Sequence, residues 1–208
     1  MTKVEVDTPQ GPANAHLHPA QKPRAGLVLG HGAAGGVSSQ DLVAATEVAL
    51  SEGVSVALVE QPYRVAGRRS PATAPRLDAA WKEVVDHLAA DQLRGLPLVV
   101  GGRSLGARVA CRTAGATGAV GVLCLAFPLQ PPQRRSATDP PPSRLPELDA
   151  VTVPTLVVQG ARDRFGIPPA SGRRTVVEVP GDHSLRTDLD AVADAVRAWL
   201  SGVVDQAG

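Results

Sequence analysis

The sequence predicts an α/β protein with a mostly parallel central sheet that helices cover on both faces. From residue 25 onward, short apolar segments alternate with segments that have the spacing of amphipathic helices. The short segments are apolar throughout and do not alternate with polar residues, as is typical of parallel strands buried on both faces. Ligands of such sheets bind beyond the carboxyl ends of the strands, so the loops at that edge are the first place to look for a site.

The predicted elements follow from apolar spacing, helix caps and glycine or proline breaks. Two short strands are expected at 4–6 and 13–17, within an N-terminal segment of residues 1–24. Buried strands are expected at 25–29, 54–59, 98–100, 120–127, 155–160 and 176–179. Helices are expected from Ser38 or Ser39 to Gly53, over 77–88, over 105–116, and from a cap at Asp188 to Gly202.

The length of 208 residues favours one domain spanning 1–208. Residues 203–208 follow the expected end of the last helix and are predicted to form a flexible tail. Residues 128–146 contain seven prolines, which predicts an irregular loop, and the segment is too short to form a lid domain. The stretch between 60 and 74 is also expected to be a loop.

Composition narrows the possible functions. The net charge of +1 does not favour nucleic acid or an anionic membrane as a partner. No secretory signal is predicted at the N-terminus, and the longest apolar run, 119–127, is too short to span a membrane. Cys111 and Cys124 are predicted to be buried thiols, which fits a cytoplasmic protein. His16 and His18 have no third ligand nearby, so exposed strand histidines are expected and no metal is predicted.

The central motif is Gly102-Arg103-Ser104-Leu105-Gly106, which lies between a predicted strand and a predicted helix. This is the G-x-S-x-G pattern of a nucleophile elbow, in the strand–turn–helix context that the pattern requires. Glycines two residues away relieve crowding around a strained central residue. A glycine-rich turn of an ordinary α/β fold is the alternative interpretation, so the motif needs a base and an acid elsewhere in the chain.

Candidates for both follow the last two predicted strands. Serine attack on an acyl group requires a base that removes the hydroxyl proton and an acid that orients this base. His183 is the candidate base, and Asp163 is the favoured acid. Asp182 and Asp139 are competing acids, although Asp182 is adjacent to His183 and is expected to point elsewhere.

The loop 30–36 completes the predicted site. Its His-Gly-x-x-Gly sequence is typical of the loop that supplies one oxyanion donor, here the N–H of Ala33, with Ala34 as second choice. The N–H of Leu105 is the other predicted donor. His31 is expected to brace this loop.

Arg103 and Arg164 flank the candidate nucleophile and acid. They are expected to be solvated or paired with carboxylates, although they could also attract an anionic substrate.

These motifs resemble those of the α/β-hydrolases, in particular small enzymes related to dienelactone hydrolase. Within that group the resemblance is strongest to a branch that includes a testis-expressed hydrolase-like protein and a subunit of the non-specific-lethal histone acetyltransferase complex. It covers about Ala25 to Leu200 and rests on 30–36, 62–69, 101–106, 127–129, 160–166 and 181–184. The branch usually has lysine, methionine and glycine where this chain has Arg103, Leu105 and Ala107. The resemblance implies a hydrolase fold with Ser104, Asp163 and His183 as the triad.

Taken together, the residues and the resemblance predict a lidless serine hydrolase. It is expected to cleave a small-molecule ester or thioester through an acyl-enzyme, with no metal or organic cofactor. Two alternatives remain open: a binding or scaffold protein that retains the hydrolase fold, and an acyltransferase that passes the acyl group to an acceptor other than water.

Overall fold

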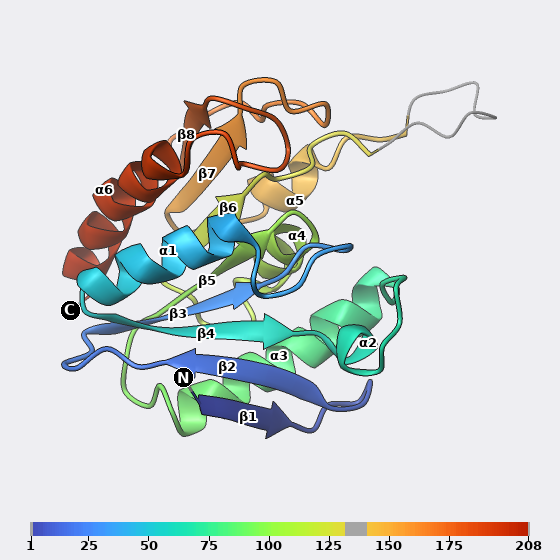
Figure 1. Cartoon of the computed structure of the whole chain (residues 1–208), viewed down its shortest axis with the longest axis vertical. Helices are drawn as coiled ribbons and strands as arrows, with labels where there is room; N and C mark the ends of the chain where they lie inside the picture. Colours follow the sequence, from blue (N-terminus) through green and yellow to red (C-terminus); the bar gives the residue numbers. More distant parts are fainter. Residues whose placement is uncertain (1, 132–140, 208) are drawn as a thin grey trace.

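The computed structural model describes residues 2–131 and 141–207. Over these residues, eight strands form one sheet in the order β1-β2-β4-β3-β5-β6-β7-β8 (Figure 1). The strands are β1 (Thr2–Val6), β2 (Ala13–His18), β3 (Ala25–Gly30), β4 (Val54–Glu60), β5 (Leu98–Arg103), β6 (Gly121–Leu125), β7 (Thr155–Gly160) and β8 (Arg174–Val179). β1 pairs with β2, and β2 pairs with β4, in antiparallel orientation. All pairings from β4 through β3 to β8, in the order of the sheet, are parallel. The predicted mostly parallel sheet is confirmed.

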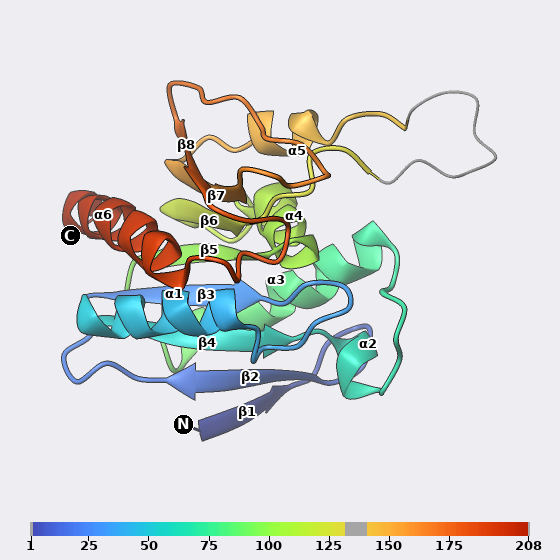
Figure 2. The same ribbon diagram turned by 45° about the horizontal axis from the view of Figure 1, so that its top comes forward.

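Helices cover both faces of this sheet, as the apolar strands predicted (Figures 1 and 2). The helices are α1 (Gln40–Ser51), α2 (Pro62–Val65), α3 (Ala74–Ala90), α4 (Leu105–Thr113), α5 (Leu145–Asp149) and α6 (Leu189–Ala207). Leu42 of α1 and Leu200 of α6 pack with Leu27 in one core. Trp81 of α3 and Val109 of α4 belong to the core on the other face. Burial on both faces explains why the central strands carry almost no polar side chains.

The last helix is longer than predicted. α6 continues through Gly202 to Ala207, so the expected helix end at Gly202 and the flexible tail from 203 are both wrong over the described residues. Val203 and Val204 are buried and pack on the same core as Leu200. Burying two valines offsets the cost of about 1 kcal/mol for a glycine inside a helix.

Two predicted loops contain short helices with a proline in the first turn. α2 lies in the expected loop after β4, and α5 begins at Leu145, inside the proline-rich segment 128–146. Pro62 and Pro146 occupy the first turn of their helices, where proline has no hydrogen bond to lose. The prediction of continuous loops is therefore wrong in these two places. Residues 132–140 of the proline-rich segment lie outside the described part of the chain.

The two cysteines and the H-x-H pair also have defined places. Cys111 and Cys124 are buried free thiols with their Sγ atoms 3.5 Å apart, as expected. His16 and His18 are half-buried, not exposed as predicted, because β2 lies inside the sheet between β1 and β4. His16 Nε2 lies 3.0 Å from Glu60 Oε2 on β4. Among the described residues, no group of three or more histidine, cysteine or acidic side chains could hold a metal ion. No described helix is long and apolar enough to cross a membrane.

Candidate active site

Ser104 occupies a sharp turn between β5 and α4. Its backbone has φ 52° and ψ −103°, a positive φ that a residue with a side chain rarely adopts. The turn is held by the Ser104 N–H, which donates to Leu125 O at 2.9 Å, and by Ser104 O, which accepts from the Arg108 N–H. Strain of this kind costs about 1–3 kcal/mol and persists where the surrounding structure enforces it. The geometry is that of the predicted elbow.

The two glycines of the motif allow three backbone segments to meet at this turn. A Cβ atom on either Gly102 or Gly106 would overlap the carbonyl oxygen of Gly30, the last residue of β3. Crowding therefore comes from a neighbouring strand as well as from the turn itself. The same close approach brings the loop after β3 beside the serine, since a Cβ on Gly32 would lie 3.7 Å from the Ser104 Cβ.

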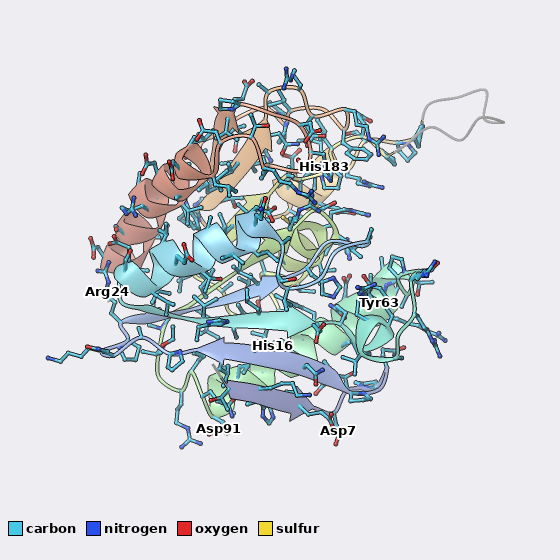
Figure 3. All side chains as sticks on the ribbon, in the orientation of Figure 1. Asp7, His16, Arg24, Tyr63, Asp91 and His183 are labelled. Carbon is cyan, nitrogen blue, oxygen red and sulfur yellow. The ribbon has the colours of Figure 1, made fainter. Side chains whose placement is uncertain are left out.

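His183 and Asp163 complete a chain of hydrogen bonds that starts at Ser104. His183 Nε2 lies 3.0 Å from Ser104 Oγ, and His183 Nδ1 lies 2.7 Å from Asp163 Oδ2. A carboxylate only accepts, so Nδ1 carries the proton and Nε2 is left to accept from the serine hydroxyl. Figure 3 shows His183 in the loop before α6. The structure thus brings together the three side chains that the sequence singled out.

His183 is not the only hydrogen-bond donor that positions Asp163. Its side chain is fully buried, and Oδ1 accepts the N–H of Phe165 at 2.9 Å. Oδ2 accepts a second hydrogen bond, at 2.7 Å, from Nε2 of the buried Gln159. Phe127 O and Gly166 O also lie 3.0 Å from Gln159 Nε2, so this nitrogen faces three acceptors.

Sequence reasoning missed two neighbours of the candidate acid and base. Gln159 is a polar residue within the otherwise apolar strand β7, and that signal could have identified it. Phe165 packs edge-on against the His183 ring, with ring centroids 4.5 Å apart. It also lies under the guanidinium of Arg164, which is exposed as expected. Gln159 thus helps to fix the carboxylate, and Phe165 packs against the ring that the carboxylate orients.

Of the two competing acids, Asp182 takes no part in this arrangement. Asp182 Oδ1 accepts from both the N–H and the hydroxyl of Ser184, so it closes a turn in its own loop. These hydrogen bonds lower the pKa of Asp182 and hold it ionised. Asp139 lies outside the described residues.

The loop after β3 is braced by His31, as expected. His31 is buried, and its Nδ1 donates to Gly32 O at 2.8 Å while its Nε2 accepts the Gln61 N–H at 3.2 Å. The Tyr63 hydroxyl donates to Ala33 O, which ties α2 to the same loop. Leu105 is the first residue of α4, where backbone N–H groups have no partner within the helix. The assignment of the Ala33 and Leu105 N–H groups as oxyanion donors stays a prediction.

Burial lowers the pKa of His31 below its ordinary value of 6.5. The unfolded chain therefore binds a proton that the folded chain does not, so stability is expected to fall as the pH drops below about 6.5, by at most about 1.4 kcal/mol per pH unit. Urea unfolding of the wild type and of His31→Gln, between about pH 8 and about pH 5, measures this. His18 has a lowered pKa too, so the difference between the two proteins isolates His31. Parallel pH profiles for the two proteins would contradict the assignment.

Arg103 joins the Ser104 turn to the loop that carries His183. Its Nε lies 2.9 Å from Oδ2 of Asp41, which is 1% exposed in the first turn of α1. The N–H is not aligned for a hydrogen bond to that oxygen, so the contact is an ion pair. The same guanidinium donates from its NH2 group to His183 O at 3.0 Å. Of the two expectations for Arg103, pairing with a carboxylate is the one confirmed.

Comparison with known proteins gave one family and many related folds. Residues 23–191 match the profile of a family described as "Alpha/beta hydrolase domain". Est1E from Butyrivibrio proteoclasticus has 17% identity and a TM-score of 0.78 over 99% of this chain and 100% of its own. A dienelactone hydrolase from Anabaena variabilis has 16% identity and a TM-score of 0.76 over 97% and 96%.

A serine hydrolase described as lacking a lid, from Xanthomonas campestris, has 19% identity and a TM-score of 0.71 over 95% of this chain and 94% of its own. At such identities these structures establish a shared fold. A search of curated protein sequences gave no match.

Proposed function

Because this chain belongs to the alpha/beta hydrolase domain family, we propose that it is a serine hydrolase that cleaves a carboxylic ester or thioester through an acyl-enzyme. The observation that carries the proposal is the chain of hydrogen bonds from Ser104 through His183 to Asp163. A positioned base next to a serine, itself oriented by a buried carboxylate, is what nucleophilic attack at neutral pH requires.

In the first step, Ser104 Oγ attacks the carbonyl carbon of the substrate while His183 Nε2 takes the hydroxyl proton. The charge that develops on the carbonyl oxygen is stabilised by the N–H groups of Leu105 and Ala33, which we assign as the oxyanion donors. Asp163 holds the Nδ1–H and stabilises the imidazolium. Collapse of the tetrahedral intermediate breaks the bond to the alcohol or thiol, and His183 returns the proton to this leaving group.

In the second step, water attacks the acyl group on Ser104. His183 Nε2 now takes a proton from the water and gives it to Ser104 Oγ as the acid leaves. The protein is regenerated, and no redox chemistry or external proton carrier is needed. No residue beyond those of the first step is required, which makes hydrolysis the simplest outcome for this arrangement.

Short acyl groups, or an acyl group on a larger carrier, are the substrates that we propose. The part of the chain that the structure describes contains no helical lid over the site. The similar Xanthomonas protein is itself described as lidless, and Est1E has been solved with ferulic acid bound. We also propose that the chain belongs to the branch with the testis-expressed protein and the acetyltransferase-complex subunit, on the motifs given above.

The proposal is tested by fluorophosphonate labelling of the purified protein, followed by intact mass and peptide mapping. One adduct located on Ser104 is the expected result, because only an activated serine reacts. A series of p-nitrophenyl esters and acyl thioesters then tests chain length, and rates are expected to fall beyond short chains. Well-folded protein that gives neither an adduct nor turnover would instead support a binding or scaffold role.

Arg103 is predicted to position His183 through its backbone carbonyl. Arg103→Ala is expected to lower kcat by about 10²-fold with a smaller change in KM, since a small displacement of a catalytic group has effects of this size. Arg103→Lys, which keeps the charge beside Asp41, is expected to recover part of the loss. Rates are measured well below the unfolding temperature of each variant. Wild-type kcat in a folded Arg103→Ala protein would contradict this role.

A further inference from the structure

The segment between β4 and α3 carries several arginines that have no acidic partner among the described residues. Residues 61–76 contain four arginines and no aspartate or glutamate: Arg64, Arg68, Arg69 and Arg76. The two carboxylates that flank the segment are engaged elsewhere. Glu60 contacts His16, and Asp78 Oδ2 accepts from Arg112 Nε at 2.8 Å. Within the described residues, none of the four arginines forms an ion pair.

Two of these arginines line one small hollow. Arg68 and Arg76 border a space of about 80 Å³, together with Gln61, Tyr63 and Leu77. Arg68 is placed by a tight turn in which Gly67 has a φ of 71° and the Arg68 N–H donates to Tyr63 O at 2.8 Å. Arg76 comes from the first turn of α3. The space suits one carboxylate or phosphate group, the partners that the guanidinium fork binds best.

The N-terminus of α3 adds to the positive potential at the same place. α3 has 17 residues, Thr73 makes no side-chain cap, and no acidic residue lies in the first turn. The positive end of the helix dipole is therefore not neutralised by the protein beside Arg76. The N–H groups of Arg76 and Leu77 already donate to Thr73 O, so the helix contributes its dipole and the two arginines supply the contacts to an anion.

We propose that this hollow binds an anionic oxygen group, a carboxylate or a phosphate, that belongs to the substrate. The link to the site runs through Tyr63, which lines the hollow and donates its hydroxyl to Ala33 O. Gln61, which also lines the hollow, donates its backbone N–H to His31 Nε2 in the same loop as Ala33. Figure 3 shows Tyr63 and His183 on the same side of the molecule. The assignment to the substrate rests on the proposed hydrolase function, whereas anion binding does not.

Binding is tested directly on the full chain, without turnover. Inorganic phosphate and succinate are titrated separately into Ser104→Ala protein at constant ionic strength, with heat release as the readout. Saturable binding of at least one anion is expected. Arg68→Gln/Arg76→Gln in the same background is expected to raise its Kd about tenfold or more, because two charge-assisted contacts are lost. Arg69→Gln is the matched control, since Arg69 lies in the same loop and does not line the hollow.

Turnover is tested with substrate pairs that differ in one charge. p-Nitrophenyl hydrogen succinate is compared with p-nitrophenyl butyrate, and acetyl-4′-phosphopantetheine with acetylpantetheine. The protein with both arginines is expected to prefer the anionic member of one pair. The double variant is expected to lose about tenfold in kcat/KM for that member alone, while the neutral member is unaffected. The preferred pair identifies the group as carboxylate or phosphate.

The outcomes separate the two proposals. Normal hydrolysis of the neutral esters with no saturable anion binding would overturn the subsite and leave the proposed function intact. Anion binding that depends on Arg68 and Arg76, with no hydrolysis of any ester, would overturn the assignment to a substrate. Equal loss for charged and neutral esters in the double variant would show a structural role and would also overturn the proposal.

Discussion

Replacing Ser104 with alanine is expected to lower kcat for ester hydrolysis by about 10⁵-fold and to abolish the fluorophosphonate adduct. In the proposed mechanism the hydroxyl bonds to the acyl carbon, and no other described serine has a histidine nitrogen at 3.0 Å from its Oγ. The substitution leaves His183 and the proposed oxyanion donors unchanged, so a small residual rate over water is expected. Initial rates with a short-chain p-nitrophenyl ester provide the measurement.

Two further variants separate loss of the nucleophile from loss of structure. Ser70→Ala removes an exposed serine and is expected to keep the wild-type rate. Ser104→Gly also removes the nucleophile, but glycine accepts the positive φ of this position without strain. It is therefore expected to be as inactive as Ser104→Ala and more stable by about 1 kcal/mol. An active Ser104→Ala protein would place the reaction at another residue.

Replacing Asp163 with asparagine is expected to lower kcat by about 10⁴-fold. Both carboxylate oxygens face donors: Oδ1 faces the Phe165 N–H, and Oδ2 faces His183 and Gln159. An amide has only one oxygen, so its NH2 group must oppose a donor in either orientation. If the NH2 group faces His183, Nδ1 becomes an acceptor, and Nε2 carries the proton and cannot take one from Ser104.

The control for this substitution is Asp182→Asn, because Asp182 directly precedes His183 in the sequence. Asp182 binds Ser184 and does not contact the His183 ring, so its loss is expected to change kcat by less than about threefold. Thermal unfolding of both variants verifies that they are folded. Similar losses in the two variants would mean that the loop as a whole, and not the carboxylate of Asp163, determines the rate.

Much of the site could be predicted because its signals are local. The elbow is specified by five consecutive residues, and the loops of Asp163 and His183 each follow a short apolar strand that the sequence makes plain. Parallel strands place their carboxyl ends at one edge of the sheet, so the order of the loops was enough to predict that they converge.

The parts that the sequence did not predict depend on partners that are distant along the chain. Gln159 and Asp163 lie only four residues apart, but the orientation of the amide is fixed by Phe127 O, 32 residues away. Nothing near Arg103 in sequence indicates that Asp41 will be its partner or that it will hold the carbonyl of His183. The same reason explains the length of α6, since Gly202 is a local stop signal that the burial of Val203 overrides.

The sequence by itself determined the fold class, the nucleophile turn and the identities of the serine, base and acid candidates, because spacing and residue type specify these within a few positions. The tertiary structure alone decided the tautomer of His183, the contacts of Arg103 with Asp41 and His183, and the hollow between Arg68 and Arg76. These are set by distances between segments up to 80 residues apart, and side-chain contacts of that kind arise only when the chain packs.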